Sequence, residues 1–459
     1  METEGLGNTM RIDQALTQLE RFVRKLNANM GAQGPPPKEF PSAVFSRQGL
    51  GGLMLWGEDG KEYRESLRSI WSLVGKREEL TISKKMAEGL VQVAILEALD
   101  LENQHRETSF DERLSAALSE LKEKLDASPV HWEIHLQVLG VKKSDRPINF
   151  GGVEFYTVDE VRLDQLRKKA LDGMGKVSAT MAGIFDKCMI EKMRDSTYAR
   201  LDVQAVDVGA ARLLAQKRLR RTLDAINFYS DVLLNGTKVY LPGEAGSRTH
   251  WSLEFRGGTP AKFTAQSSHA GPFPAYSVAN LRSEATRYGW DRISQILENK
   301  ERSDLEERIL SAVEWAGRAT VEERNEEAFL MFAISLEVLL LGSDVESELT
   351  HRLATRGAHL MMKDFRGRRE VQRDLKKLYK TRSSIVHSGK LMITEAELGR
   401  IRFLVKTALV VVLTAEPYFS MRSEKKFDDW FEDESLKGSS QEVAGDGGRS
   451  GDSGQEAEV

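Results

Sequence analysis

Residues 371–390, VQRDLKKLYKTRSSIVHSGK, decide how the C-terminal third of the chain is interpreted. The residues that recur here at intervals of three and four, the spacing of one face of an α-helix, are Val371, Leu375, Leu378, Arg382 and Ile385. Arg382 stands where Leu or Ala would be the ordinary choice, and a guanidinium on an apolar face requires a charged or hydrogen-bonding partner. His387 follows at the expected end of this helix, and Gly389 is a typical C-terminal stop. The segment therefore predicts a helix that also carries polar chemistry.

The same helical period extends to both sides of this segment. Apolar stripes with a spacing of three and four residues cover 305–316, 329–340, 349–360 and 401–412. Thr394 and Glu397 have the spacing of a capping box, which marks the start of the last of these helices. Five helices with short connections predict an all-α bundle over residues 279–420.

The preceding part of the chain has a different pattern. Residues 1–128 are mainly helical in their spacing, whereas residues 129–278 mix a helical stripe at 215–226 with stretches in which apolar and polar residues alternate. Alternation is the pattern of a half-buried strand, and it covers 132–138, 148–155, 200–205, 237–241 and 250–256. Gly151 and Gly152 predict a bulge or bend within the second stretch. We therefore expect an α+β amino-terminal region followed by the all-α bundle.

The composition describes a globular chain without a strong overall charge. The 459 residues are 40% hydrophobic and 30% charged, and the net charge of −4 means that any polyanion site must be a local cluster of cations. Cys188 is the only cysteine, which fits a reducing compartment, and we expect it to be buried. No stretch approaches the roughly 18 apolar residues of a membrane span, so we expect a cytoplasmic protein without membrane contact. Residues 421–459 are acidic and end in a Gly/Ser/Asp/Glu-rich stretch, which predicts a disordered tail.

Glu337, Arg382 and His387 are not explained by packing alone. Glu337 lies inside ISLEVLLL, on a helix that is apolar nearly all round, and a buried carboxylate requires a cationic or hydrogen-bonding partner. An imidazole can accept the proton of an RNA 2′-hydroxyl, and a guanidinium can stabilise the charge that grows on the phosphate oxygens. Arg382 and His387 therefore predict metal-independent RNA cleavage. Since Arg-x-x-x-x-His is a weak pattern by itself, a structural role is the alternative.

The segment LYKTRSSIVHSGK, residues 378–390, closely resembles the signature of Apea-like HEPN domains. The segments SAVEWAGRA, FAISLEVLLLG and ELTHRLATRGAHLM precede it in the order that this family uses, so the resemblance covers about residues 300–415. It implies a homodimer in which two Arg-His motifs face one another and form a composite ribonuclease site. It also implies a role in bacterial stress response or antiviral defence, under the control of an unidentified trigger or antitoxin.

The resemblance assigns roles to individual residues. Arg382 and His387 correspond to the catalytic pair, and Ser383 and Tyr379 occupy supporting positions beside the arginine. Glu337 would brace the arginine and is expected to be structural. The expected products are 2′,3′-cyclic phosphate and 5′-hydroxyl ends, and the family's chemistry implies neither a metal nor another cofactor.

Basic residues crowd the segment before the motif. Residues 363–382 contain nine Lys or Arg against three acids, which predicts a local positive field able to hold an RNA backbone. The candidate RNA contacts are Arg366, Arg368, Arg369, Lys376, Lys377 and Lys380. A solvated helix face is the alternative. A second basic cluster, interpreted as a solvent face with RNA contact as the alternative, comprises Lys217, Arg218, Arg220 and Arg221.

The sequence is compatible with two kinds of function, an enzyme and a non-catalytic binding module. The first is a ribonuclease whose α+β region senses a trigger or restrains the dimer. The second is a non-catalytic RNA-binding or dimerisation module. His387 should line an open groove with Arg382 beside it under the first, and be buried against the core under the second. His131 and His135 share a strand face without a third metal ligand nearby, and both are expected to be surface residues.

Overall fold

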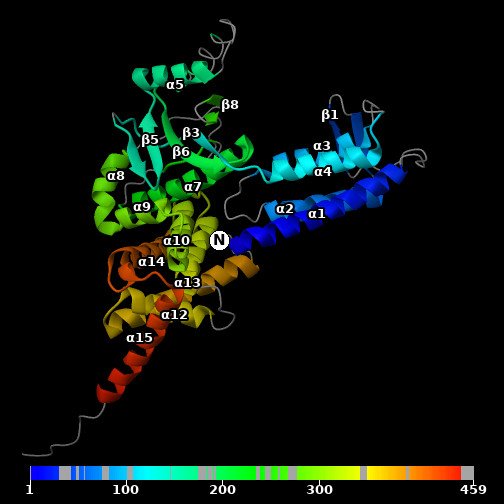
Figure 1. The fold of residues 1–459 in the computed structure, drawn as a ribbon. Coiled ribbons are helices and arrows are strands. Elements are labelled where there is room, and N and C mark those ends of the chain that lie inside the picture. The colour runs from blue at the N-terminus through cyan, green and yellow to red at the C-terminus, as the bar shows by residue number, and fades with distance from the viewer. Residues whose placement is uncertain are drawn as a thin grey trace, which may run out of the picture.

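The computed structural model shows a mostly helical protein with a small sheet region in its N-terminal half (Figure 1). It describes residues 2–29, 43–47, 51–55, 57–74, 82–100, 107–144, 146–173, 183, 190, 193–233, 238–242, 250–256, 259–266, 277–341, 349–388 and 392–445. Cys188 lies outside these residues, and so does Gly389, the expected helix stop.

The first part of the chain forms a helical unit with a core of its own. The helices expected from the sequence are present as α1 (Glu2–Asn29), α2 (Gly57–Val74), α3 (Lys84–Leu99) and α4 (Phe110–Leu125). Leu19, Ile95 and Leu121 are among the side chains buried between them. A two-stranded antiparallel sheet, β1 (Ala43–Arg47) and β2 (Gly51–Leu55), was not predicted. Strands of five residues joined by a short loop show too little alternation to be recognised.

A polar joint connects this unit to the rest of the molecule. Asp207 caps α7 (Val208–Val232), and its carboxylate accepts the backbone N–H groups of Gly209 and Ala210 at 2.7 and 3.0 Å. The same carboxylate accepts the backbone N–H of Ser83 at 2.8 Å and its hydroxyl at 3.0 Å. Because Ser83 is the N-cap of α3, the N-termini of both helices meet at one negative charge, which stabilises both.

In the described part of the chain, six antiparallel strands form the main sheet, in the order β4-β5-β6-β3-β7-β8. Their bounds are β3 (Val130–Gln137), β4 (Ile148–Phe150), β5 (Val153–Thr157), β6 (Thr197–Ala205), β7 (His250–Arg256) and β8 (Thr259–Gln266). Trp132, Ile134 and Leu136 of β3 join the core on the side of α7. The alternate residues of β3 face α5 (Glu160–Gly173), as the ion pair between Glu133 and Lys169 shows. The sheet therefore lies between two helical layers.

Two details of the sheet differ from the sequence-based expectation. Residues 148–155 are not one bent strand: β4 and β5 pair with each other, and Gly151 and Gly152 form the turn between them with φ of 61° and 72°. Positive φ is accessible to glycine at little cost, so two adjacent glycines favour a tight turn. Residues 237–241 form no strand within the described range 238–242, where Tyr240 makes a single bridge to Leu139.

The second half of the chain is helical. Its helices are α8 (Val278–Ala285), the short 3-10 helix η3 (Thr286–Tyr288), α9 (Trp290–Glu298), α10 (Asp304–Val321), α11 (Asn325–Leu341), α12 (Leu349–Met361), α13 (Phe365–Ser388), α14 (Glu395–Thr414) and the 3-10 helix η4 (Tyr418–Ser420). The five stripes expected from the sequence are α10 to α14. The capping box of Thr394 and Glu397 is confirmed at the start of α14.

The acidic tail expected from residue 421 is wrong for its first part, because α15 (Glu424–Gly445) is a helix. Phe427 and Phe431 are 0% and 2% exposed and pack with α10 and α12. Asp428 lies between two buried arginines, 3.3 Å from Arg308 and 2.7 Å from Arg356. Aromatic residues at intervals of three and four give α15 an apolar stripe that the acidic composition conceals.

Sheet and bundle share one continuous core. A single buried cluster runs from Trp132 of β3 to Phe431 of α15, and α7 lies between the sheet and α10 (Figure 1). Gly317 permits the closest approach of α10 to α7, because a Cβ at this position would lie 1.9 Å from the backbone oxygen of Asp224. The sheet therefore rests on the bundle through a tightly packed helix pair.

Candidate functional site

Arg382 is held by a glutamate from a neighbouring helix. It lies near the end of α13, and Glu337 reaches it from α11. Arg382 Nε is 3.1 Å from Glu337 Oε1, and Arg382 Nη2 donates to Glu337 Oε2 at 3.4 Å. The Tyr379 ring centre lies 5.7 Å from the Arg382 guanidinium carbon. The two charged residues that interrupt the apolar stripes of their helices are therefore each other's partner.

This ion pair is half-buried. The side chains of Arg382 and Glu337 are 27% and 20% exposed, so solvent reaches both. Burial raises the pKa of Glu337, while the guanidinium of Arg382 opposes that rise. A carboxylate that grips one edge of a guanidinium fixes its direction and leaves its other N–H groups able to bind an anion.

His387 lies in the last turn of α13 and is exposed. Five residues separate it from Arg382, which corresponds to about 140° around the helix axis and about 7.5 Å along it. No hydrogen bond or ion pair joins these two side chains in the part of the chain that the structure describes. Arg382 faces α11 and His387 faces solvent, so one chain does not close a site around a phosphate.

A stripe of basic side chains leads along α13 to His387. Positions at intervals of three and four lie on one face of a helix. Counting back from His387, the positions on this face are Ser383, Lys380, Lys376, Arg373, Arg369 and Arg366. All five basic residues among them are exposed. We call Arg366, Arg369, Arg373, Lys376 and Lys380 the cationic stripe.

The cationic stripe has little acidic compensation. Arg366 lies 3.5 Å from Glu370 and is itself 91% exposed. Asp374 is turned to α14, where it accepts from Arg400 Nε at 2.8 Å. Among the described residues, the basic side chains of this helix that make no ion pair are Arg369, Arg373, Lys376, Lys377 and Lys380. An uncompensated row of cations creates a local positive potential that attracts polyanions.

Arg368 differs from the other residues expected to contact RNA. Its side chain is 26% exposed and lies 3.9 Å from Glu434 of α15. Its Nε donates to the backbone oxygen of Met362 at 3.0 Å. The guanidinium therefore supports the α12–α13 connection and α15, and it is not part of the cationic stripe.

Two residues of this surface were not among the expected RNA contacts, although Arg373 belongs to the basic segment recognised in the sequence. Arg373 belongs to the cationic stripe, and Phe365 opens α13 with 60% of its surface exposed. Both line a shallow groove of about 490 Å³, together with Arg366, Arg369 and Lys376. The signal was the sequence FRGRR, in which an aromatic residue is interleaved with basic ones.

The surroundings of His387 are partly apolar. Val386 is 51% exposed, and Met392, in the segment that leads to α14, is 82% exposed. Ser383 is half-buried and has no hydrogen-bond partner among the side chains described. Val386 therefore offers apolar surface directly next to His387 in the sequence.

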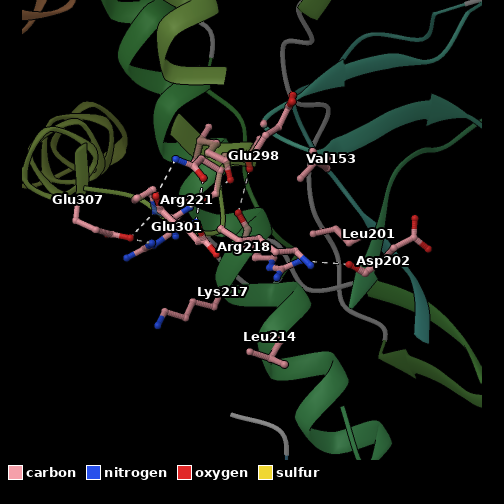
Figure 2. Close-up of a pocket in the computed structure, with 17 residues that line it drawn as sticks. Val153, Leu201, Asp202, Leu214, Lys217, Arg218, Arg221, Glu298, Glu301 and Glu307 are labelled. Atoms are coloured by element: carbon pink, nitrogen blue, oxygen red, sulfur yellow. Dashed lines mark hydrogen bonds and ion pairs between the residues drawn. The ribbon is translucent and has the colours of Figure 1, made fainter. Parts of the chain in front are cut away.

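Three residues of the second basic cluster, Lys217, Arg218 and Arg221, line a cleft between the sheet and the bundle (Figure 2). The cleft has a volume of about 590 Å³ and is walled by α7, the β4–β5 turn, β6 and the α9–α10 connection. Figure 2 shows Lys217, Arg218 and Arg221 on the helix side, opposite Leu201. The expected solvent face is correct for Lys217 and Arg220, which are exposed, and wrong for the half-buried Arg218 and Arg221.

The arginines of this cleft are already bound to protein groups. Arg221 lies 2.7 Å from Glu314 and 3.5 Å from Glu307, and Glu307 also pairs with Arg302. Arg218 donates to the backbone oxygen of Asp202 at 3.2 Å. Because two carboxylates compensate the charge of Arg221 and a backbone oxygen binds Arg218, these arginines attract a polyanion less than the cationic stripe does.

The two histidines of β3 are not both surface residues. His131 is exposed and lies 3.0 Å from Asp202, but His135 is only 1% exposed. The ring nitrogens of His135 contact the Tyr156 hydroxyl at 2.6 Å and the Glu133 carboxylate at 2.7 Å. The expectation was wrong for His135 because α5 covers this face of the sheet.

No group of three or more His, Cys, Asp or Glu side chains suited to a metal occurs among the described residues. None of the described helices combines the length and apolar character needed to span a membrane. No protein-family model, curated protein or solved structure matches the chain. The resemblance to Apea-like HEPN domains therefore stays a prediction, and the function must be argued from the site.

Proposed function

We propose that this protein is a metal-independent endoribonuclease of the HEPN type that acts as a homodimer. The observation that carries the proposal is the position of His387, exposed at the end of the cationic stripe and one helix face away from Arg382. Arg382 is fixed by Glu337 yet reached by solvent. A proton acceptor and an oriented positive charge at the end of a polyanion-binding surface are what RNA self-cleavage needs.

The proposed reaction uses the 2′-hydroxyl of the substrate as its nucleophile. His387 accepts the 2′-hydroxyl proton, the 2′-oxygen attacks phosphorus, and the bond from phosphorus to the 5′-oxygen breaks. The histidine of the second protomer protonates the departing 5′-oxygen, and Arg382 stabilises the charge on the non-bridging oxygens. The products are a 2′,3′-cyclic phosphate and a 5′-hydroxyl, and DNA is not cut because it lacks the nucleophile.

A second protomer would complete the site. Arg382 and His387 of one chain lie about 140° apart around α13, so a phosphate held between two α13 helices would meet an arginine and a histidine from different chains. Val386, the residue before His387 in α13, supplies exposed apolar surface for this contact. In a dimer with twofold symmetry, the same surface patch of both protomers forms the interface.

The α+β region and the N-terminal helices would then sense a trigger or restrain the dimer. The joint at Asp207 and Ser83 ties the N-terminal unit to α7, and α7 packs on α10. A role in bacterial stress response or antiviral defence rests on the family resemblance.

The decisive experiment incubates the purified full-length protein with total RNA in EDTA and identifies the ends produced. We expect cleavage with 2′,3′-cyclic phosphate ends, and a loss of about 1,000-fold in rate for His387→Ala and for Arg382→Ala. The matched controls are His351→Ala, an exposed histidine on α12, and Arg324→Ala, an arginine that is 62% exposed. Both controls should cleave at the wild-type rate. Equal rates for all variants, or cleavage that requires added metal, contradicts the proposal.

The second candidate function is a non-catalytic RNA-binding or dimerisation module. The observation that favours it is the ion pair of Arg382 with Glu337 in the same chain, since such a pair is also a common structural device. In that case His387→Ala leaves both RNA binding and dimerisation intact, and no RNA ends appear with the wild-type protein. Size-exclusion chromatography with light scattering, run beside the cleavage assay, measures the dimer directly.

A further inference from the structure

We propose that the outer face of α13 is a track for single-stranded RNA, with Phe365 as a base-stacking platform at the end farthest from His387. This inference names the substrate class and the path of the strand, and only its placement of the cleavage point at His387 rests on the proposed ribonuclease function. Its observations are the charge of the cationic stripe, the groove at its start and the exposure of an aromatic ring there.

The charge pattern fits an extended strand. The cationic stripe places a basic side chain on nearly every turn of α13, from Arg366 to Lys380. Helix turns are about 5.4 Å apart, so the charges form a straight row. Of the described acids nearby, Glu370 and Asp374 are partnered by Arg366 and Arg400, and the exposed Asp364 accepts the backbone N–H of Gly367 at 2.8 Å. Four of the five cations make no ion pair among the described residues, and such a row can follow the phosphates of a single strand and give a binding energy that depends on salt.

The start of the stripe adds a surface for a base. Phe365 is 60% exposed, and the Arg369 guanidinium carbon lies 5.7 Å from its ring centre. Arg369, Arg373 and Lys376 continue the same groove, which has a volume of about 490 Å³. An exposed aromatic ring beside cations can stack on an unpaired base while the cations hold its phosphate. Bases inside a duplex are already stacked on each other, so the platform selects single strands.

The helix also sets a length for the substrate. Phe365 and His387 are 22 positions apart on a continuous helix, about 33 Å at the usual rise. An extended strand of about six nucleotides spans this distance, within the range of site sizes known for single-strand binders. Shorter oligonucleotides cannot contact Phe365 and His387 at the same time, so they should lose one of these two contacts.

Binding is measured by fluorescence anisotropy with full-length His387→Ala protein, so that the RNA stays intact. The probes are single-stranded RNAs of four, eight and twelve nucleotides and a twelve-base-pair duplex. We expect the twelve-mer to bind about 10-fold more tightly than the four-mer and than the duplex. A duplex that binds as tightly as the single strand, or affinity that does not depend on length, overturns the inference.

Phe365→Ala tests the platform against a closely matched control. Phe403 on α14 is 49% exposed and has the Arg400 guanidinium carbon 5.4 Å from its ring centre, the same arrangement on another helix. We expect Phe365→Ala to weaken binding of the eight-mer about 10-fold and Phe403→Ala to leave it unchanged. Equal effects of the two substitutions overturn the role of Phe365.

Charge reversal tests the track itself. Lys376→Glu with Lys380→Glu should weaken single-strand binding about 30-fold, and the salt dependence of log K should flatten by about 0.7 for each cation removed. Lys217→Glu with Arg220→Glu, exposed on α7, is the control with the same change of charge and should bind normally. Equal losses in the two double variants overturn the track. If wild-type protein binds single strands in this way but produces no RNA ends, the track stands and the proposed ribonuclease function falls.

Discussion

Helices α7 and α13 are nearly equal in length, with 25 and 24 residues, and both are rich in basic side chains. Their charges are used in different ways. Along α7, Arg221 lies 2.7 Å from Glu314, and the buried Asp231 pairs with Arg402 and Lys406 of α14. Along α13, the cationic stripe points to solvent with almost no acidic partner.

The difference shows that a basic segment is informative only when the positions of nearby acids are known. Asp224 of α7 also lies 3.0 Å from Arg318 of α10, so this polar side chain too makes its contact within the fold. Free cations, in contrast, keep their full attraction for an external polyanion. We therefore propose that α7 serves the architecture of the molecule and that α13 serves its function.

The largest expected effect concerns the contact of α7 with α10. Gly317→Ala would place a Cβ 1.9 Å from the backbone oxygen of Asp224, so the two helices must separate. We expect the free energy of unfolding to fall by about 3 kcal/mol, measured by urea denaturation. Gly399→Ala on α14 is the control, because its Cβ would meet nothing within 4 Å. That change should raise stability by about 0.5 to 1 kcal/mol. Equal effects would show that α7 and α10 are not tightly packed.

The next effect concerns the ion pairs of α7. Asp231 is 2% exposed, and Asp231→Asn removes the negative charge that Arg402 and Lys406 share. We expect a loss of about 2 kcal/mol in the free energy of unfolding. Lys377→Ala on α13, an exposed residue without an ion pair, should change it by less than about 0.5 kcal/mol. A loss of similar size in both variants would contradict the division between the two helices.

A smaller effect is expected where α13 meets the core. Glu337→Gln keeps the shape of the side chain but removes the charge that orients Arg382. We expect RNA cleavage to fall about 10-fold through kcat, with RNA affinity and dimerisation unchanged, because Glu337 acts through the arginine. Glu337→Asp, which keeps the charge, should recover part of the rate. A reduced affinity with normal kcat would instead place Glu337 in RNA binding.

Measured per pH unit, the smallest effect is a dependence of stability on pH. Burial raises the pKa of Asp224 to about 7, against the opposing charge of Arg318. Since the unfolded chain has the lower pKa of about 3.9, the folded state holds an extra proton between these values. Stability from this group is complete below about pH 4 and is lost as pH rises through about 7, by up to about 1.4 kcal/mol per pH unit. Asp224→Asn should flatten the urea midpoint between pH 5 and 7, and an unchanged profile would exclude Asp224 as the cause.

Helical spacing was the most reliable guide to the fold. The stripes of Leu305 to Ala316 and Ile401 to Val412 predicted α10 and α14, because a period of 3.6 repeated over several turns has few alternative explanations. The hairpin of β4 and β5 was assigned to one bent strand, since its strands are only three and five residues long. Helix α15 was concealed by its acidic composition, although Phe427 and Phe431 have helical spacing.

The candidate site was predictable in its residues but not in its arrangement. Arg382 and Glu337 each interrupt an apolar stripe, and this spacing showed only that each needs a partner; that Glu337 braces the arginine was implied by the family resemblance alone. The segment of basic residues was visible, but the sequence could not separate Arg368, which is bound to Glu434, from the exposed Arg373. His135 looked like a surface residue until α5 was seen to cover it.

By itself, the sequence determined which segments become helices and where polar groups interrupt apolar faces, because both follow from spacing along one chain. Only the tertiary structure decided which charges are compensated, since an ion pair such as that of Arg221 with Glu314 joins residues that are far apart in the chain. The sequence alone does not distinguish the outward-facing cations of α13 from the inward-facing charges of α7. They differ because packing brings acids to α7 and leaves the face of α13 that leads to His387 open to solvent.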